Sequence, residues 1–190
     1  MEIERKWLLP HLPSDAPVHS QTAIFQAYVA EHPGVVLRVR RTATRRDGEQ
    51  FTLIAKGAGL RARNEWEVKI PEWLFEELWG ISTDAIMKSR RVTETGEEID
   101  VFAGELDGLV LMEREFPTTE DAEVYVLPAW AQGAIEVTDN REYQNVHLGK
   151  LSGEAAQVFL RSSQNLFTKQ QIGRAVRWAV ARPPSEFEMF

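Results

Sequence analysis

The chain has 190 residues, a net charge of −7 at pH 7, 43% hydrophobic residues and no cysteine. This size and composition suit one soluble globular domain and exclude a disulfide framework or a thiolate metal site. The acidic balance argues against a general nucleic-acid binder, and the start MEIERKW lacks the apolar run of a signal peptide, so we expect a cytoplasmic protein without a membrane span.

Eight segments in which polar and apolar residues alternate between turn residues are predicted to be strands. In chain order they span residues 2–8, 22–30, 35–41, 50–56, 64–70, 85–93, 97–103 and 109–116, and residues 134–138 are a candidate ninth. Helices are predicted at 71–80 and 118–126, and at 153–167 and 169–181 after the strands. We therefore expect an α+β, mainly β domain, with strands over residues 1–148 and a helical extension of the same domain over residues 149–190.

One face of each predicted strand is rich in charge, because residues two apart in a strand share a face. Within a strand these charges are grouped by sign, whereas the opposite faces are mostly apolar and are interrupted by Arg5, Arg41 and Arg114. The acidic positions of the charged face are Glu2, Glu4, Glu65, Glu67, Glu98, Asp100, Glu113 and Glu115, and the basic positions are Lys6, Arg38, Arg40, Lys56, Lys69, Lys88 and Arg90.

Two arrangements fit this pattern. An open sheet could turn its charged face to water and its apolar face to helices, which is a common arrangement. Eight antiparallel strands can instead close into a barrel that holds one small ligand, with the charged face inside and helices outside. Grouping by sign favours the barrel, because a face that serves only solubility mixes signs.

Charges inside a barrel would need water or ions around them, because each unpaired charge in a dry interior lowers the stability of the fold by roughly several kcal/mol. Clustered carboxylates suit a hard divalent cation such as Mg²⁺ or Mn²⁺. Clustered arginines and lysines suit a polyphosphate chain, because a guanidinium group can donate two parallel hydrogen bonds to phosphate oxygens. A metal that bridges to phosphate would link the two sets.

Short motifs in a fixed order resemble the CYTH superfamily, the triphosphate tunnel metalloenzymes, over about residues 1–148. They are EIERKW, which matches an ExExK motif, then QAY, LRVR, LIAKG, RNEWEVKI, KSRR, EIDVF, MEREF and EVTDNREYQN. The chain is most similar to the small bacterial tripolyphosphatases of that family. It departs from them at Arg91, where relatives often carry a tyrosine, and in its longer helical tail, which could cap one mouth of the tunnel, dimerise or cover the barrel wall.

The resemblance implies an eight-stranded antiparallel β-barrel, covered by helices, that hydrolyses a terminal phosphoanhydride of a triphosphate, with inorganic tripolyphosphate as the expected substrate. The implied cofactor is Mg²⁺ or Mn²⁺, and we expect a small-molecule substrate and no nucleic-acid or membrane partner, with a homodimer left open. The implied metal ligands are Glu2, Glu4, Glu65, Glu67, Asp100, Glu113 and Glu115. The implied triphosphate-binding residues are Arg38, Arg40, Lys56, Lys88 and Arg90.

Lys6 and Tyr28 complete the expected site as candidate catalytic residues. Lys6 could take a proton from the attacking water while Tyr28 orients that water. In the competing interpretation, Lys6 only balances Glu2 and Glu4, and Tyr28 only fills the lumen. The sequence leaves both interpretations open, because neighbouring cations and carboxylates act on a lysine in opposite directions.

Other activities on the same barrel remain open at this point. An adenylate cyclase or a thiamine or nucleoside triphosphatase would need a pocket for the rest of its substrate, and no residues that would form one are evident in the sequence. A polyphosphate-binding module without turnover would lack part of the motif set, which is complete here.

Overall fold

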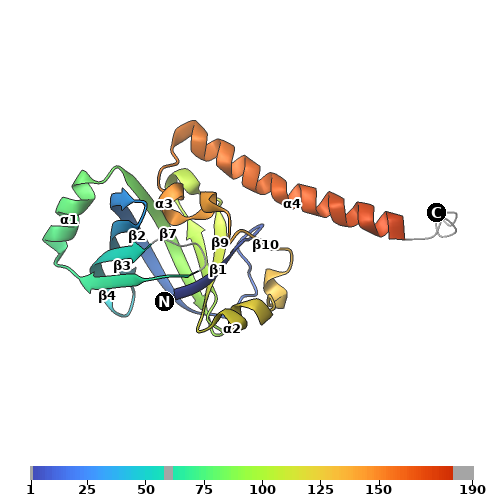
Figure 1. The fold of residues 1–190 in the computed structure, drawn as a ribbon, viewed down its shortest axis with the longest axis horizontal. Coiled ribbons are helices and arrows are strands. Elements are labelled where there is room, and N and C mark those ends of the chain that lie inside the picture. Colours follow the sequence, from blue (N-terminus) through green and yellow to red (C-terminus); the bar gives the residue numbers. More distant parts are fainter. Residues whose placement is uncertain (1, 58–61, 182–190) are drawn as a thin grey trace.

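The computed structural model describes residues 2–57 and 62–181, except the side chains of residues 2, 62, 63 and 171–181. An antiparallel sheet carries the fold, and the helices lie outside it and across one end (Figure 1). The strands are β1 Glu2–Leu8, β2 Val18–His32, β3 Val35–Thr44, β4 Gly48–Gly57, β5 Ala62–Arg63, β6 Glu65–Lys69, β7 Asp84–Thr93, β8 Glu98–Phe102, β9 Val110–Phe116 and β10 Ile135–Glu136. The α-helices are α1 Glu72–Ile81, α2 Thr119–Val124, α3 Asn145–Leu148 and α4 Gly153–Ala181, and short 3₁₀ turns are η1 Gly104–Leu106, η2 Ala129–Ala131 and η3 Arg141–Tyr143.

The predicted strands are present, with differences at their ends. Strand β2 extends beyond 22–30 at both ends, and β3 and β4 are also longer than predicted. The segment predicted at 64–70 is β6, which the short strand β5 precedes, and the candidate strand at 134–138 is β10. The prediction of two helices after residue 152 was wrong, because a single helix, α4, runs through Thr168. No proline or glycine lies between Glu154 and Ile172, so nothing in that stretch ends a helix.

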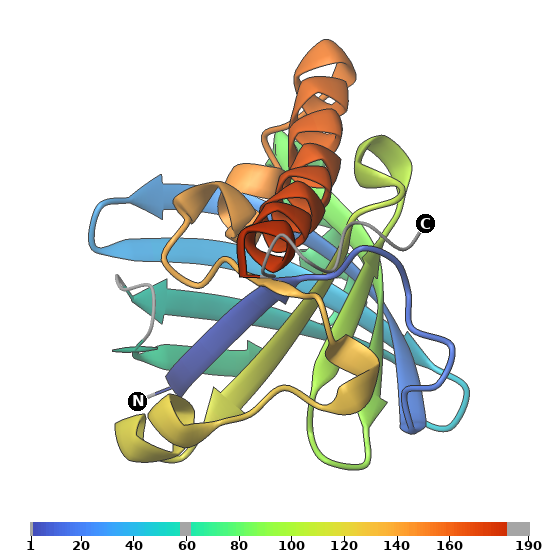
Figure 2. The ribbon, with the colours of Figure 1, turned by 90° about the vertical axis from the view of Figure 1, so that its right-hand side faces the viewer.

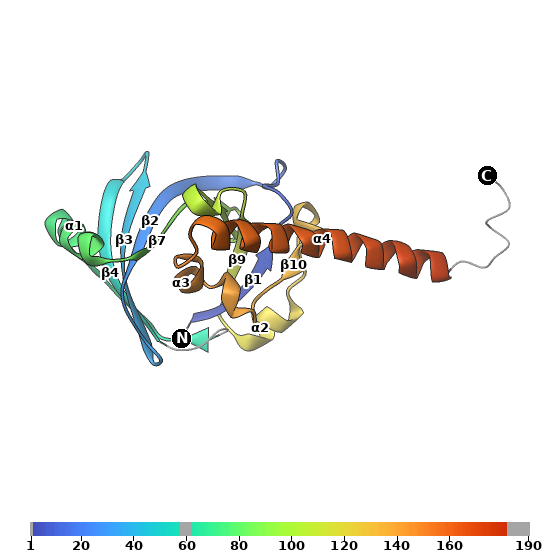
Figure 3. The same ribbon diagram turned by 90° about the horizontal axis from the view of Figure 1, so that it is seen from above.

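The strands are hydrogen-bonded in the order β10-β1-β9-β8-β7-β2-β3-β4-β6. The sheet curves so strongly that β1 comes to lie beside the strands that precede α1 (Figures 2 and 3). Across that seam β5 pairs with β1, through Glu2 with Arg63 and Ile3 with Ala62. The mainly β, antiparallel architecture with outer helices is therefore confirmed, and among the described residues these two pairs are the ones that join the two ends of the ladder.

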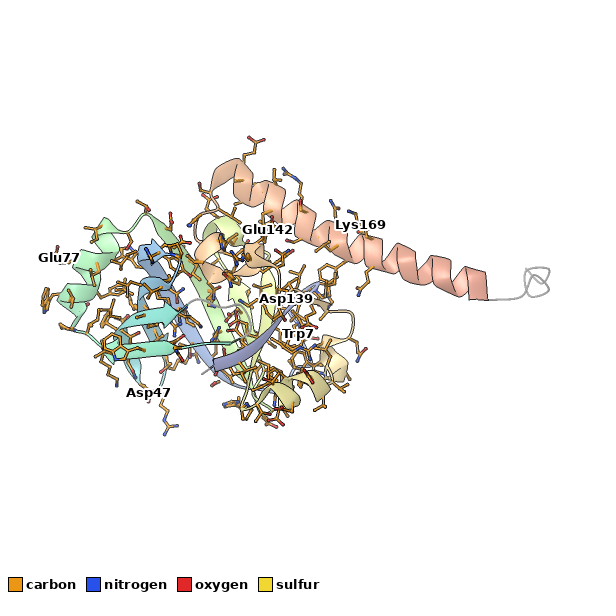
Figure 4. All side chains as sticks on the ribbon, in the orientation of Figure 1. Trp7, Asp47, Glu77, Asp139, Glu142 and Lys169 are labelled. Carbon is orange, nitrogen blue, oxygen red and sulfur yellow. The ribbon has the colours of Figure 1, made fainter. Side chains whose placement is uncertain are left out.

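The outer face of the sheet is apolar and is covered in two places. Trp7 lies on the α2 side of β1 (Figure 4) and packs in a buried cluster with Ile99 and Met112. Phe75 of α1 packs on Ala27 and Val39 of β2 and β3. Helix α1 leaves the outer face of β6 uncovered, so Trp66 stays 57% exposed, contrary to the expected helical cover.

The inner face is apolar at one end. Leu8 and Leu111 face each other across β1 and β9, and they share a buried cluster with Phe102 and Ile86. Tyr143 and Leu148, with residues of the first half of α4, pack into the same cluster. The segment after β10 therefore closes this end of the curved sheet, and α4 then continues away from the body (Figure 1). None of the helices described is both long and apolar enough to cross a membrane.

Candidate functional site

A cavity of about 140 Å³ opens on the inner face, beyond the apolar end. It is a polar space large enough for about five water molecules at the volume that each occupies in the liquid. The predicted site residues that line it are Glu4, Lys6, Tyr28, Arg38, Arg40, Lys56, Glu65, Arg90, Glu113 and Glu115. Gln144, Asn145 and Val146, at the start of α3, also line it. These predicted residues come from β1, β2, β3, β4, β6, β7 and β9, and the strand period places them on the face of the sheet that borders the cavity.

One wall of the cavity is basic. Arg38 is only 5% exposed, with a terminal nitrogen 3.5 Å from Glu65, and Lys56 Nζ lies 2.9 Å from the same carboxylate. Burial lowers the pKa of Arg40 to about 10, and the neighbouring charges of Arg38 and Arg90 add to that shift. An anion bound in the cavity would stabilise the protonated guanidinium of Arg40 against both its burial and the repulsion of its neighbours.

The opposite wall is acidic and is built on the pairing of β1 with β9. Glu4 lies directly opposite Glu115, and Lys6 lies opposite Glu113. Lys6 Nζ is 2.7 Å from Glu113 Oε1 and 3.4 Å from Glu4 Oε1, and it donates a hydrogen bond of 3.3 Å to the carbonyl oxygen of Tyr143. Burial alone would raise the pKa of Glu113, but Lys6, Lys88 and Arg90 hold it well below its usual range.

Behind the acidic wall a cluster of charges joins β7, β8 and β9. Arg90 donates to both oxygens of Asp100, at 2.8 and 2.7 Å, and to Glu113 Oε2 at 2.6 Å, and it also pairs with Glu98. Asp100 is fully buried and is paired with Lys88 as well. Burial lowers the pKa of Lys88 to about 8, against the opposing effect of Asp100.

Three of the predicted site residues whose side chains are described do not line the cavity. Lys88 and Asp100 lie beneath it in the charge cluster, and Glu67 lies on exposed β6 opposite Ile54. The side chain of Glu2 lies outside the described part of the chain. Glu98, which shares the charged face but had no predicted role, faces Glu113 across β8 and β9.

The carboxylates are suited to a divalent cation by their chemistry and their register. Like charges directly opposite each other in a sheet are destabilising, so the Glu4–Glu115 pair favours a bound cation between its strands. Carboxylate oxygens are the ligands that Mg²⁺ and Mn²⁺ prefer. Lys6 and Arg90 now supply compensating charge, and within residues 2–57 and 62–181 no three acidic or histidine side chains are grouped closely enough to hold a metal as they stand.

The position of Tyr28 depends on residues that the sequence did not assign to the site. The ladder between β2 and β3 has a bulge between Tyr28 and Ala30, and such bulges re-aim neighbouring side chains. The ring of Tyr28 lies so close to Gly149 that a Cβ there would be 3.0 Å from Cε2. The hydroxyl accepts a hydrogen bond of 2.7 Å from Gln26 Nε2. The QAY motif contains Gln26, but no spacing argument reveals this contact.

Known proteins similar to this chain share an activity. A curated protein of Nitrosomonas europaea called inorganic triphosphatase is 32% identical over 155 residues, which is 76% of this chain and 93% of that protein. A crystal structure of an inorganic triphosphatase is 30% identical, with a TM-score of 0.58, and the match covers 80% of this chain and 97% of that one. A Hippeastrum protein studied as an adenylyl cyclase, and described as having a dominant triphosphatase activity, is 14% identical with a TM-score of 0.51 over 86% of this chain and 97% of that one, which supports the fold alone. No protein-family model matches the chain.

Proposed function

This chain belongs to the inorganic triphosphatases of the CYTH superfamily, and we propose that it cleaves the terminal phosphoanhydride of inorganic tripolyphosphate with the help of Mg²⁺ or Mn²⁺. The observation that carries the proposal is a cavity in which a basic wall faces an acidic wall. Phosphoryl transfer needs positioning and charge neutralisation more than covalent chemistry, and such a cavity supplies both. A cytoplasmic location, a homodimer and the division of the chain at residue 148 stay predictions.

Arg38, Arg40 and Lys56 are the cations best placed to hold the triphosphate. Arg38 and Lys56 share the carboxylate of Glu65. Arg90 also lines the cavity, but its nitrogens contact Asp100, Glu113 and Glu98, so most of its charge is already balanced. We assign Arg90 to phosphate binding at the edge of this cluster, and Lys88 with Asp100 to holding Arg90 in place.

Glu4 of β1, with Glu113 and Glu115 of β9, would hold a divalent cation at the acidic wall. Glu2, from β1 as well, and Glu65 and Glu67 of β6 would complete the ligand set. Asp100 would act on this set through Arg90, which contacts Glu113. A bound divalent cation supplies charge neutralisation at the phosphate oxygens of the substrate. The contacts of Lys6 with Glu113 and Glu4 support the interpretation that Lys6 balances those carboxylates over the one in which it acts as a base.

A direct assay tests the proposed function. The purified protein is expected to release phosphate from tripolyphosphate in the presence of Mg²⁺ or Mn²⁺, and more slowly from ATP and thiamine triphosphate, because the charged side chains that line the cavity suit phosphate groups and a cation better than a nucleobase or a thiazole ring. Phosphate release and cyclic AMP formation should be measured in parallel. Cyclic AMP as the main product would favour a cyclase, and tight tripolyphosphate binding without turnover would favour a binding module.

Tyr28 is expected to work as a hydrogen-bond donor and not as a base. Burial raises its pKa to about 12, outweighing the opposite effect of Arg38, so the phenol stays protonated at every pH at which the enzyme is assayed. Tyr28→Phe should therefore lower kcat by about tenfold without removing any limb of the pH–rate profile between roughly pH 6 and 10. A limb that disappears in Tyr28→Phe would contradict this role.

Gly149→Ala is expected to lower kcat by about tenfold, because misplacement of a substrate-contacting group by less than an ångström is costly. The added Cβ would lie 3.0 and 3.2 Å from two ring carbons of Tyr28, so the ring must shift. Gly80→Ala is the matched control, since a Cβ there meets nothing within 4 Å. Equal kcat values for the two variants would show that the close approach of Gly149 does not position Tyr28.

A further inference from the structure

Gln26 is a buried polar side chain on the inner face of β2 that the proposed mechanism does not use. It is 1% exposed and lies directly opposite Arg40 in the ladder between β2 and β3. Its Nε2 lies 2.7 Å from Tyr28 Oη, and its Oε1 accepts a hydrogen bond of 3.2 Å from Arg40 Nε. One amide thus connects a tyrosine and an arginine that both line the cavity.

The chemistry of the three groups determines which way the tyrosine proton points. A guanidinium has only donors, so the amide oxygen of Gln26 must face Arg40 and the amide nitrogen must face Tyr28. An amide nitrogen can only donate, so Tyr28 Oη is the acceptor in that contact and must direct its own proton elsewhere. Among the described residues, none accepts a hydrogen bond from Tyr28 Oη, and the side chain borders the cavity.

The same amide orients Arg40. The Nε of Arg40 donates its hydrogen bond to Gln26, and within the described residues no other hydrogen bond of Arg40 is found. The two terminal nitrogens of the guanidinium therefore remain for a ligand in the cavity. Phosphate oxygens accept hydrogen bonds, and donors that are oriented before the substrate binds cost no reorganisation during the reaction.

We propose that Gln26 is a positioning residue that turns the Tyr28 hydroxyl proton into the cavity, so that Tyr28 donates a hydrogen bond to a phosphate oxygen of the bound triphosphate. This inference rests on the proposed function. It predicts that a change at Gln26 affects turnover through the Tyr28 hydroxyl and not through the packing of β2. The two possibilities differ in whether the loss of turnover depends on that hydroxyl.

The test is a double-mutant cycle of Gln26→Glu with Tyr28→Phe, with kcat and KM for tripolyphosphate as readouts. Gln26→Glu keeps an oxygen for Arg40 Nε but replaces the donor that faces Tyr28 by an acceptor, so the hydroxyl proton turns back to the carboxylate. We expect kcat to fall about tenfold in the wild-type background and less than about twofold in the Tyr28→Phe background. The added negative charge acts equally in both backgrounds, so it cancels from the cycle.

Gln21→Glu is the matched control, because it makes the same change on the same strand but on the outer face, where Gln21 donates to Ser89 Oγ. Its kcat and KM should equal those of the wild type. If Gln26→Glu does not fold, as judged by its melting temperature, Gln26→Met removes the same donor without adding charge, and the cycle is then measured on the Kd for tripolyphosphate in chelator.

Equal losses from the Gln26 substitution in both backgrounds would overturn the inference while leaving the proposed function intact. A wild-type protein that does not hydrolyse tripolyphosphate would overturn the proposed function, and the inference with it. A loss that is confined to the background that contains Tyr28 supports the inference.

Discussion

Glu4→Gln and Glu115→Gln are each expected to lower tripolyphosphate turnover by roughly 100-fold, because a neutral amide is a poor ligand for a hard divalent cation. The two carboxylates face each other directly across β1 and β9 and line the same cavity. Excess chelator should abolish the turnover of the wild type and have little further effect on the variants. Phosphate release, measured as a function of Mg²⁺ and Mn²⁺ concentration and in excess chelator, gives the turnover of each protein and its dependence on the metal.

Glu115→Gln should not lower stability, which separates loss of metal binding from misfolding. Replacing the exposed member of a like-charged cross-strand pair removes a repulsion, so the melting temperature of this variant in chelator should stay the same or rise. Glu4→Gln also removes an ion-pair partner of Lys6, which keeps Glu113, so its melting temperature is measured as well. Glu49→Gln is the matched control, since Glu49 pairs with Arg41 away from the cavity. Full turnover by Glu4→Gln or Glu115→Gln, or undiminished hydrolysis in chelator, would refute the metal assignment.

Arg40→Met is expected to raise the KM for tripolyphosphate by roughly 10- to 100-fold, the loss expected when a charged donor to phosphate is removed. Methionine keeps the apolar stem of the side chain and removes only the guanidinium. Burial and two neighbouring cations lower the pKa of Arg40, so its removal should not destabilise the protein. High salt should imitate the variant only partly, because screening is weak in an enclosed site.

Arg41→Met is the control for this result. Arg41 is the next residue in β3, lies on the other face and pairs with Glu49, so its loss should leave KM unchanged. Titration calorimetry with tripolyphosphate in chelator would show whether the change in KM reflects binding. Equal affinities of Arg40→Met and the wild type would remove Arg40 from the phosphate-binding set.

Much of the fold could be predicted from residue patterns, because strand periodicity is a local property of the backbone. The alternation in EIERKW, LRVR and MEREF assigns each side chain to a face, and the ladder places those faces together as expected. The helix boundary at Thr168 was wrong because no residue there interrupts a helix. The uncovered outer face of β6 could not be foreseen, because the length and path of α1 decide which strands it covers.

The sequence by itself determined which charged residues share the inner face, since a period of two residues needs no knowledge of the fold. Only the tertiary structure decided how each charge is balanced. In the sequence, Arg40 and Arg90 look alike, since each is an arginine two residues after another basic residue of its strand. In the structure, Arg90 is enclosed by carboxylates from β8 and β9, whereas Arg40 contacts the amide of Gln26. The difference arises because the partners of each charge come from other strands of the sheet, so their depth and distance are set by strand register and by how the sheet curves and not by the residues on either side.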